Sequence, residues 1–204
     1  MSKEVGIINL GLSNLGSIFN AIKYCNAQPK LINNFKQINK YKYVILPGIG
    51  SFHLASKIII KKNLKSYLQD FIENNGKFFG ICLGMQLMFE NSDEYGQSKG
   101  MGFFKGNVSK FKDLKIKIPH VGFNFVKHDN HKIWKGIPLK SKFYFIHSYK
   151  IDKRLNQKKI KYLICNYSKP FIAFVRKENI FASQFHPEKS GDSGIRLLKN
   201  FINL

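Results

Sequence analysis

A cysteine between two glycines forms the most chemically suggestive segment of the chain. Gly80-Ile81-Cys82-Leu83-Gly84 joins the apolar run Lys77–Ile81 to a stretch with helical spacing. A sharp turn from strand to helix holds a nucleophile in a strained backbone conformation, and flanking glycines let neighbouring backbone approach. The helix N-terminus favours a thiolate at Cys82, and the N–H of Leu83 would point to where an oxyanion forms. The alternative for this segment alone is a buried cysteine in a tight turn.

A histidine and a glutamate two positions apart are suited to activate such a thiol. They lie in Gln184-Phe185-His186-Pro187-Glu188, directly after an apolar run that ends near Ser183. In an extended segment the two side chains point to the same side, and Pro187 stiffens the turn. A carboxylate beside an imidazole fixes its tautomer and stabilises the imidazolium. Histidine and glutamate at this spacing are also common on surface loops, so the pair is informative only together with the cysteine.

The first half of the chain alternates between short apolar runs and helical patterns. Alternation of this kind is typical of βαβ units and a parallel sheet. The expected helices run from a cap at Ser13 or Asn14 to about Cys25, from about Lys61 to Asn74, and from Cys82 to about Phe89. The expected strands are Val5–Asn9, Lys30–Ile32, Tyr43–Leu46 and Lys77–Ile81.

The second half has closely spaced strand patterns, which favour hairpins. A final helix is expected from about Ser193 to Ile202. The two halves together predict an α/β fold whose central sheet is mixed and mostly parallel, with flanking helices and a hairpin-rich second half. The expected strands here are Asn107–Phe111, Phe143–His147, Lys161–Ile164, Phe171–Val175 and Ile180–Gln184.

The length and composition of the chain indicate one globular domain spanning residues 1–204. Hydrophobic residues make up 44% and charged residues 23%, which excludes a fibrous or disordered chain. No apolar run reaches about 18 residues, and the N-terminus lacks the layout of a signal peptide. The three scattered cysteines form no disulfide framework. These features predict a cytoplasmic protein with no membrane partner.

The net charge is unusually high, because the chain has 34 basic and 12 acidic side chains, which gives +22. Such a charge would suit a nucleic acid, a membrane surface or an acidic protein partner. The alternative is compositional, since abundant Lys, Asn, Ile and Phe are expected from an AT-rich genome. The basic residues are spread along the chain and no nucleic-acid motif accompanies them, so we expect no nucleic-acid partner.

The remaining histidines and cysteines have ordinary structural explanations. His120 and His147 are as compatible with a buried structural position as with a function. His128-x-x-His131 lacks further ligands at zinc spacing, so we predict no metal and no cofactor. The two other cysteines, Cys25 and Cys165, are expected to be small buried hydrophobes.

Several motifs, in order along nearly the whole chain, resemble the class I, or triad, glutamine amidotransferases. The paired segments around Cys82 and His186 are specific for that family. Within it, the chain is most similar to the glutaminase subunits of imidazole glycerol phosphate synthase, called HisH. The motifs that carry this similarity, besides the two segments above, are Leu46-Pro47-Gly48-Ile49-Gly50-Ser51-Phe52, Lys117-Ile118-Pro119-His120-Val121-Gly122-Phe123-Asn124, Tyr144-Phe145-Ile146-His147-Ser148-Tyr149 and Glu188-Lys189-Ser190.

The resemblance implies hydrolysis of L-glutamine to glutamate and ammonia by a Cys-His-Glu triad. Cys82 would attack the side-chain amide, His186 would transfer protons, and Glu188 would orient His186. The oxyanion hole would use Leu83 and the segment Gly48, Ile49 and Gly50, whose peptide is expected to flip before an N–H faces the oxyanion. The residues that match positions holding the amino and carboxylate groups of glutamine are Gln86, Glu94, Ser148 and Tyr149.

The resemblance also implies a heterodimer with a HisF-like (β/α)8 barrel synthase, to which ammonia passes without release into water. The barrel would use it to form imidazole glycerol phosphate and AICAR in histidine biosynthesis. The residues that match interface or signalling positions near the tunnel mouth are Asn14, His120, Phe123, Tyr144 and Lys189.

The departures from the family pattern lie on the partner-facing side. Gly16 stands where a basic residue is frequent, Val121 replaces a usual methionine, and Phe123 replaces a usual tryptophan. The segment Asn9-Leu10-Gly11 also lacks a usual tyrosine. The alternative function is therefore a HisH-like paralogue that supplies ammonia to a HisF-like partner for amidination of a surface sugar, such as a nonulosonate.

Overall fold

Consecutive apolar residues explain why the central strands are buried on both faces of one sheet. The computed structural model describes residues 2–12, 15–112, 116–152 and 159–204. Its main sheet has the order β11-β12-β13-β4-β3-β1-β2, in which the pairs from β13 to β2 are parallel and the pairs β11-β12 and β12-β13 are antiparallel. The strands are β1 Glu4–Ile8, β2 Gln28–Ile32, β3 Tyr43–Leu46, β4 Lys77–Ile81, β11 Lys161–Tyr167, β12 Lys169–Lys177 and β13 Ile180–Ser183.

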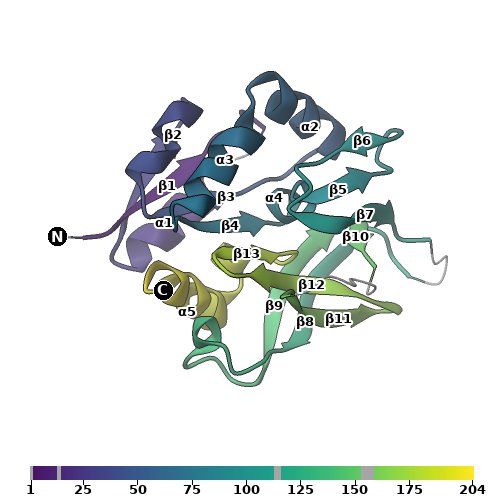
Figure 1. Ribbon diagram of the computed structural model, residues 1–204. Coiled ribbons are helices and arrows are strands. Elements are labelled where there is room, and N and C mark those ends of the chain that lie inside the picture. Colours follow the sequence, from purple (N-terminus) through teal and green to yellow (C-terminus); the bar gives the residue numbers. More distant parts are fainter. Residues whose placement is uncertain (1, 13–14, 113–115, 153–158) are drawn as a thin grey trace.

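Helices cover both faces of this sheet. Helices α2 and α3 lie on one face, and α1 and α5 lie on the other (Figure 1). The α-helices are α1 Gly16–Tyr24, α2 Phe52–Lys61, α3 Leu64–Glu73, α4 Leu83–Gln86 and α5 Gly191–Ile202, and the 3-10 helices are η1 Phe35–Lys40, η2 Lys132–Trp134 and η3 Pro187–Lys189.

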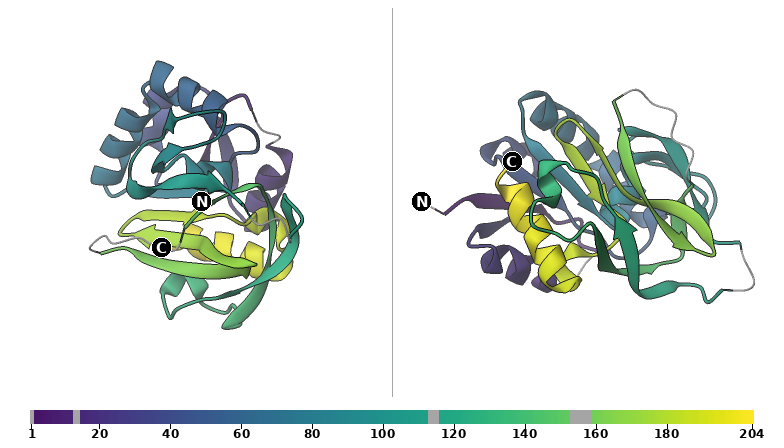
Figure 2. Two further views of the ribbon diagram at one scale, coloured as in Figure 1. Left: turned by 90° about the vertical axis from the view of Figure 1, so that its right-hand side faces the viewer. Right: turned by 90° about the horizontal axis from the view of Figure 1, so that it is seen from below.

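Two smaller sheets flank the main one. A four-stranded sheet of order β10-β7-β5-β6 packs on the side of α2 and α3, and the hairpin β8–β9 crosses the opposite face beside α5 (Figure 2). We call this hairpin the β8–β9 ribbon. The strands are β5 Phe89–Ser92, β6 Ser98–Lys99, β7 Phe104–Lys110, β8 His120–Lys127, β9 Lys140–His147 and β10 Tyr149–Ile151.

Aromatic packing joins α5 to the strands that lead to the candidate site. Phe201 in α5 is fully buried, and its ring centroid lies 5.2 Å from that of Phe79 in β4 and 5.8 Å from that of Phe181 in β13. Aromatic pairs at such separations add to the free energy of area burial. Because Cys82 follows β4 and His186 follows β13, this cluster fixes the two strands from which the predicted triad emerges.

The helices differ from the sequence prediction just before and just after β4. The helix expected from about Lys61 to Asn74 is present as α3, which begins only at Leu64 because the chain turns at Asn63, whose φ is +50°, and the preceding helix α2 was not expected. The helix after Cys82 ends at Gln86 rather than near Phe89, because Phe89 begins a strand of the four-stranded sheet. The expected caps Ser13 and Asn14 lie outside the described residues.

The strand prediction is confirmed for the main sheet and incomplete elsewhere. β3 and β4 have the predicted bounds, and the antiparallel pairs β11–β12 and β12–β13 confirm the hairpins expected in the second half. Strands β5, β6, β8 and β10 were not expected. The residues that the structure describes include no helix long and apolar enough to cross a membrane.

Removal of the Phe201 ring should destabilise the packing of β4 and β13, the strands that lead to the candidate site. We expect Phe201→Ala to lower the free energy of unfolding by about 3–5 kcal/mol, because truncating a buried phenylalanine leaves a cavity. Urea unfolding followed by circular dichroism measures this change. Tyr24→Ala, at a side chain that is 76% exposed, should change it by less than about 0.5 kcal/mol. Equal effects of the two substitutions would contradict the assignment of Phe201 as an anchor.

Candidate active site

Cys82 lies in a backbone conformation that only a tight turn imposes. Its φ is +54° and its ψ is −108°, and it caps the short helix α4 directly after β4. Its N–H donates to the carbonyl oxygen of Ser183 in β13 at 2.7 Å. A Cβ atom added at Gly84 would lie 1.9 Å from the carbonyl oxygen of Leu46, so the turn needs glycine there. The geometry therefore agrees with the predicted strand-turn-helix and places the sulfur at the carboxyl end of the sheet.

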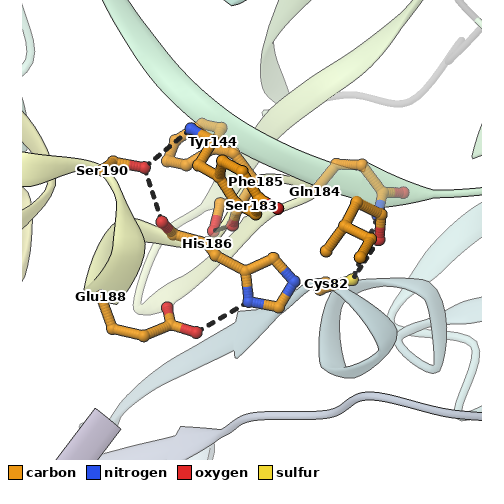
Figure 3. A network of polar contacts seen from close by, with 9 residues as sticks. Cys82, Tyr144, Ser183, Gln184, Phe185, His186, Glu188 and Ser190 are labelled. Atoms are coloured by element: carbon orange, nitrogen blue, oxygen red, sulfur yellow. Dashed lines mark hydrogen bonds and ion pairs between the residues drawn. The ribbon is translucent and has the colours of Figure 1, made fainter. Parts of the chain in front are cut away.

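His186 reaches the same edge because β13 runs parallel to β4. Its Nδ1 lies 2.7 Å from Oε1 of Glu188, and both side chains are almost fully buried. Figure 3 shows the imidazole ring between the Glu188 carboxylate and Cys82, with its second nitrogen on the side of the sulfur. That nitrogen, Nε2, forms no hydrogen bond with the described residues. The arrangement leaves Nε2 available to exchange a proton with the thiol or a substrate.

The charges around His186 favour its protonated form. Burial alone would lower the pKa of His186, but the neighbouring Cys82 sulfur and the Glu188 carboxylate raise that pKa to about 10. Burial raises the pKa of the two remaining thiols, to about 11 for Cys25 and to about 12 for Cys165. Within the described part of the chain, Cys82 is the cysteine that has a histidine base beside it.

A cavity of about 410 Å³ opens onto Cys82. It is large enough for a small ligand. Every predicted substrate-binding residue lines it, and so do three residues of the predicted oxyanion hole, Leu83, Ile49 and Gly50. The full lining is Ile49, Gly50, Cys82, Leu83, Gln86, Glu94, Tyr95, Lys110, Pro119, Ile146, His147, Ser148 and Tyr149.

The lining contains charged groups that suit the two ends of an amino acid. Burial raises the pKa of Glu94, whose carboxylate accepts the backbone N–H of Phe52. Lys110, at the end of β7, was not anticipated from the sequence, because its segment carries no motif, and neither was Tyr95. A carboxylate and an ammonium on one cavity wall complement a zwitterion.

The predicted oxyanion donor has a partner in this structure. The N–H of Leu83 donates to the carbonyl oxygen of Gly48 at 3.4 Å. A Cβ atom at Gly48 would lie 2.8 Å from Cβ of Leu83, so these two segments are in close contact. Gly50 has a φ of +123°, a backbone conformation that glycine adopts most readily.

Backbone hydrogen bonds tie the β8–β9 ribbon to His186. The N–H of His186 donates to the carbonyl oxygen of Tyr144 at 2.9 Å. The N–H of Tyr144 in turn donates to Oγ of Ser190 at 2.9 Å, and that hydroxyl donates to the carbonyl oxygen of His186 at 2.6 Å (Figure 3). A displacement of the ribbon would therefore be transmitted to the histidine backbone.

The residues predicted at the partner interface differ widely in their exposure. Phe123 is 57% exposed and packs edge-on against Tyr144 across the ribbon, and Lys189 is exposed. His120 is only 2% exposed: it stacks on Tyr167 and its Nδ1 lies 3.1 Å from Nε2 of His147, so it is not a surface contact here. Burial lowers the pKa of His120 to about 4. Asn14 lies outside the described residues.

The class of protein follows from comparison with known families. Residues 6–204 match the family described as glutamine amidotransferase class-I, and the chain belongs to that family. It is 41% identical over 199 residues to the imidazole glycerol phosphate synthase subunit HisH of Caldanaerobacter subterraneus subsp. tengcongensis, covering 97% of this chain and 96% of the relative. The HisH subunit of Helicobacter hepaticus is 39% identical and covers all of both chains.

Solved structures agree with this fold. A crystal structure of a glutamine amidotransferase superposes with a TM-score of 0.75 at 17% identity, covering 98% of this chain and 99% of the other. The structure of PurLQS from Thermotoga maritima gives a TM-score of 0.79 at 16% identity, covering 100% and 99%. At such identities the likeness establishes the fold, which confirms the predicted fold class.

The protonation of His186 should depend on Glu188. We expect Glu188→Gln to lower the pKa of His186, because the neutral amide no longer compensates the burial of an imidazolium. Titration of the imidazole resonances by NMR measures the change. Glu178→Gln removes an exposed carboxylate that pairs with Lys159 and should leave the His186 titration in place. An unchanged titration in Glu188→Gln would mean that the carboxylate does not control the histidine.

Proposed function

We propose that this chain is the glutaminase subunit of imidazole glycerol phosphate synthase, acting as one domain in the cytoplasm with Cys82, His186 and Glu188 as its triad. The observation that carries the proposal is the placement of a His–Glu pair beside a cysteine in a strained turn, at the mouth of a cavity with groups suited to an amino acid. The full-length similarity to HisH subunits supports the histidine pathway.

The chemistry follows from the positions of these groups. The thiolate of Cys82 attacks the amide carbon of glutamine, and the imidazolium of His186 gives its proton to the departing nitrogen, which leaves as ammonia. The neutral imidazole then takes a proton from a water molecule that attacks the thioester. The C–S bond breaks, glutamate forms, and the thiolate and the imidazolium are restored. Glu188 keeps Nε2 of His186 directed at the reacting atoms throughout.

The cavity lining supports glutamine as the substrate. Glu94 and Gln86 would bind the α-amino group, and Ser148 and Tyr149 would bind the α-carboxylate, to which Lys110 adds a positive charge. Glutamine bound in this way points its side-chain amide to Cys82, because the sulfur forms another part of the same lining.

The β8–β9 ribbon is where we expect the barrel subunit to dock. Alternate residues of β8 place three apolar side chains at the surface: Val121 is 53% exposed, Phe123 57% and Phe125 43%. Ile146 of β9 pairs with Val121 in the hairpin and also lines the cavity. An exposed apolar strip is typical of a protein interface. Ammonia released at Cys82 would therefore emerge beside the docked partner, as channelling requires.

The contact between Leu83 and Gly48 suggests how the partner would control activity. While the carbonyl oxygen of Gly48 accepts the N–H of Leu83, the segment presents an acceptor where an oxyanion needs donors. Rotation of the Gly48–Ile49 peptide would turn the N–H of Ile49 toward the reacting carbonyl oxygen and release the N–H of Leu83. We propose that docking of the barrel with its own substrate favours this rotated form.

The nucleophile is tested by removing its sulfur. We expect Cys82→Ala to abolish glutamine hydrolysis while the protein stays folded, because no covalent intermediate can form. A glutamine-directed alkylator should label Cys82 alone in the intact protein, as peptide mass spectrometry would reveal. Cys25→Ala removes a buried thiol outside the cavity and should retain activity. Glutaminase activity that persists in Cys82→Ala would eliminate the mechanism.

The partner's role is tested by measuring glutamine turnover of the isolated chain and of its mixture with the barrel synthase. We expect low turnover alone and a rise of at least about 10²–10³-fold with the barrel and its substrate, since one oxyanion donor contributes about that much. Phe123→Asp should abolish the rise by placing a charge in the apolar strip. Leu54→Asp, at a similarly exposed residue on the opposite face of the main sheet, should not. Full activity of the isolated chain would refute the gating, and a rise only with a sugar-amidinating barrel would refute the pathway.

A further inference from the structure

A buried glutamine beside the nucleophile has no role in the mechanism described so far. Gln184 follows β13 and has no exposed surface. Its side chain extends to the sulfur of Cys82, and the distance from Nε2 to Sγ is 3.7 Å (Figure 3). Burying an amide is costly unless its polar atoms are bonded. A fully buried glutamine at this place therefore needs an explanation in terms of its partners.

A chain of hydrogen bonds fixes which end of the Gln184 amide faces the sulfur. The amide Nε2 of Gln86 donates to the carbonyl oxygen of Tyr149 at 3.0 Å and to Oε1 of Gln184 at 3.0 Å. Because the carbonyl oxygen of Tyr149 can only accept, Gln86 must present its nitrogen there, and Gln184 must present its oxygen to Gln86. The nitrogen of Gln184 is left to face Cys82.

We propose that Gln184 is a positioning residue that donates a hydrogen bond to the sulfur of Cys82 and stabilises its thiolate form. A donor to the charged form of an acid favours ionisation. The significance of this contact for catalysis rests on the proposed glutaminase function, but the contact itself does not.

The other partner of the sulfur cannot fill this role. Sγ lies 3.8 Å from the carbonyl oxygen of Ile146, which can accept a hydrogen bond from the thiol but has no hydrogen to donate to a thiolate. When that proton passes to Nε2 of His186, Gln184 supplies an N–H donor from a neutral group, and the imidazolium supplies the charge. The titratable and charged groups that face Cys82 or its cavity are His186 with Glu188, His147, Glu94, Tyr95, Tyr149 and Lys110.

The test measures the rate at which iodoacetamide alkylates Cys82 as a function of pH, with the site of modification confirmed by mass spectrometry. We expect Gln184→Met, which keeps the length but removes the donor, to raise the pH midpoint of alkylation by about one unit. At a fixed pH below both midpoints, Gln184→Met should be alkylated about tenfold more slowly than the native chain. Ser56→Ala removes a different buried hydrogen bond, to the carbonyl oxygen of Lys99, and should leave the midpoint unchanged.

A measurement on the native chain keeps the proposal testable if Gln184→Met does not fold. The side-chain amide protons of Gln184 should shift in NMR spectra with the same pH midpoint as alkylation, and should not titrate in Cys82→Ala. The proposal would be overturned by an unchanged alkylation midpoint in folded Gln184→Met. It would equally be overturned if the chemical shifts of the Gln184 amide protons did not change as Cys82 ionises. Alkylation needs no glutamine turnover, so a shifted midpoint in a protein without glutaminase activity would refute only the proposed function.

Discussion

The positive φ of Cys82 is the constraint on which the candidate site depends. A non-glycine residue in such a conformation costs on the order of 1–3 kcal/mol and persists only where its surroundings impose it. Here β4 is held between β3 and β13, the N–H of Cys82 is bonded to Ser183, and Gly84 lies against the carbonyl of Leu46. The same register pairs Ser183 with Ile81, so the residues after both strands emerge at one edge. The strain at the thiol and the position of His186 thus have a common cause.

The site is assembled from parts that differ in burial. The turn at Cys82 and strand β13, which leads to His186, belong to the buried main sheet. Tyr144 belongs to the β8–β9 ribbon, whose apolar strip is exposed. The ribbon nevertheless bonds to the backbone of His186 and contributes the carbonyl of Ile146 beside the sulfur. A partner that binds the exposed strip therefore contacts an element with direct bonds to two of the reacting residues, and no long chain of intermediates is needed to couple docking to the triad.

The sequence predicted the central strands from their continuous apolar runs, and it missed elements whose apolar pattern faces outward or suits another type of element. Strands β3 and β4 were predicted with their bounds because each is a continuous apolar run. Strand β8 was missed because Val121, Phe123 and Phe125 point outward, so its alternation does not mark a core face. Helix α2 was missed because its Ile58-Ile59-Ile60 run is typical of a strand, whereas a cap at Ser51 and tertiary packing make it helical.

The site residues that could be predicted are those whose placement depends on local backbone geometry. The spacing of the glycines around Cys82 and of His186 and Glu188 could be read directly, because local backbone geometry determines where these side chains go. Lys110 and Gln184 could not be assigned a role, since their placement depends on contacts between β7, α4 and β13 that no single segment encodes. His120 was associated with the partner by its motif, but the stacking of its ring on Tyr167 places it in the interior.

Two buried histidines near His186, His120 and His147, affect the electrostatics of the site by remaining neutral. Burial lowers the pKa of His147, the hydrogen bond between its Nδ1 and the carbonyl oxygen of Tyr149 raises it, and the nearby His120 and His186 lower it; the result is about 3. At neutral pH His147 then adds no positive charge next to the imidazolium at His186. Protonation of His147 would place such a cation beside His186, and its repulsion would favour loss of the His186 proton. The protonated form of His186 therefore depends on the burial of the His120–His147 pair as well as on Glu188.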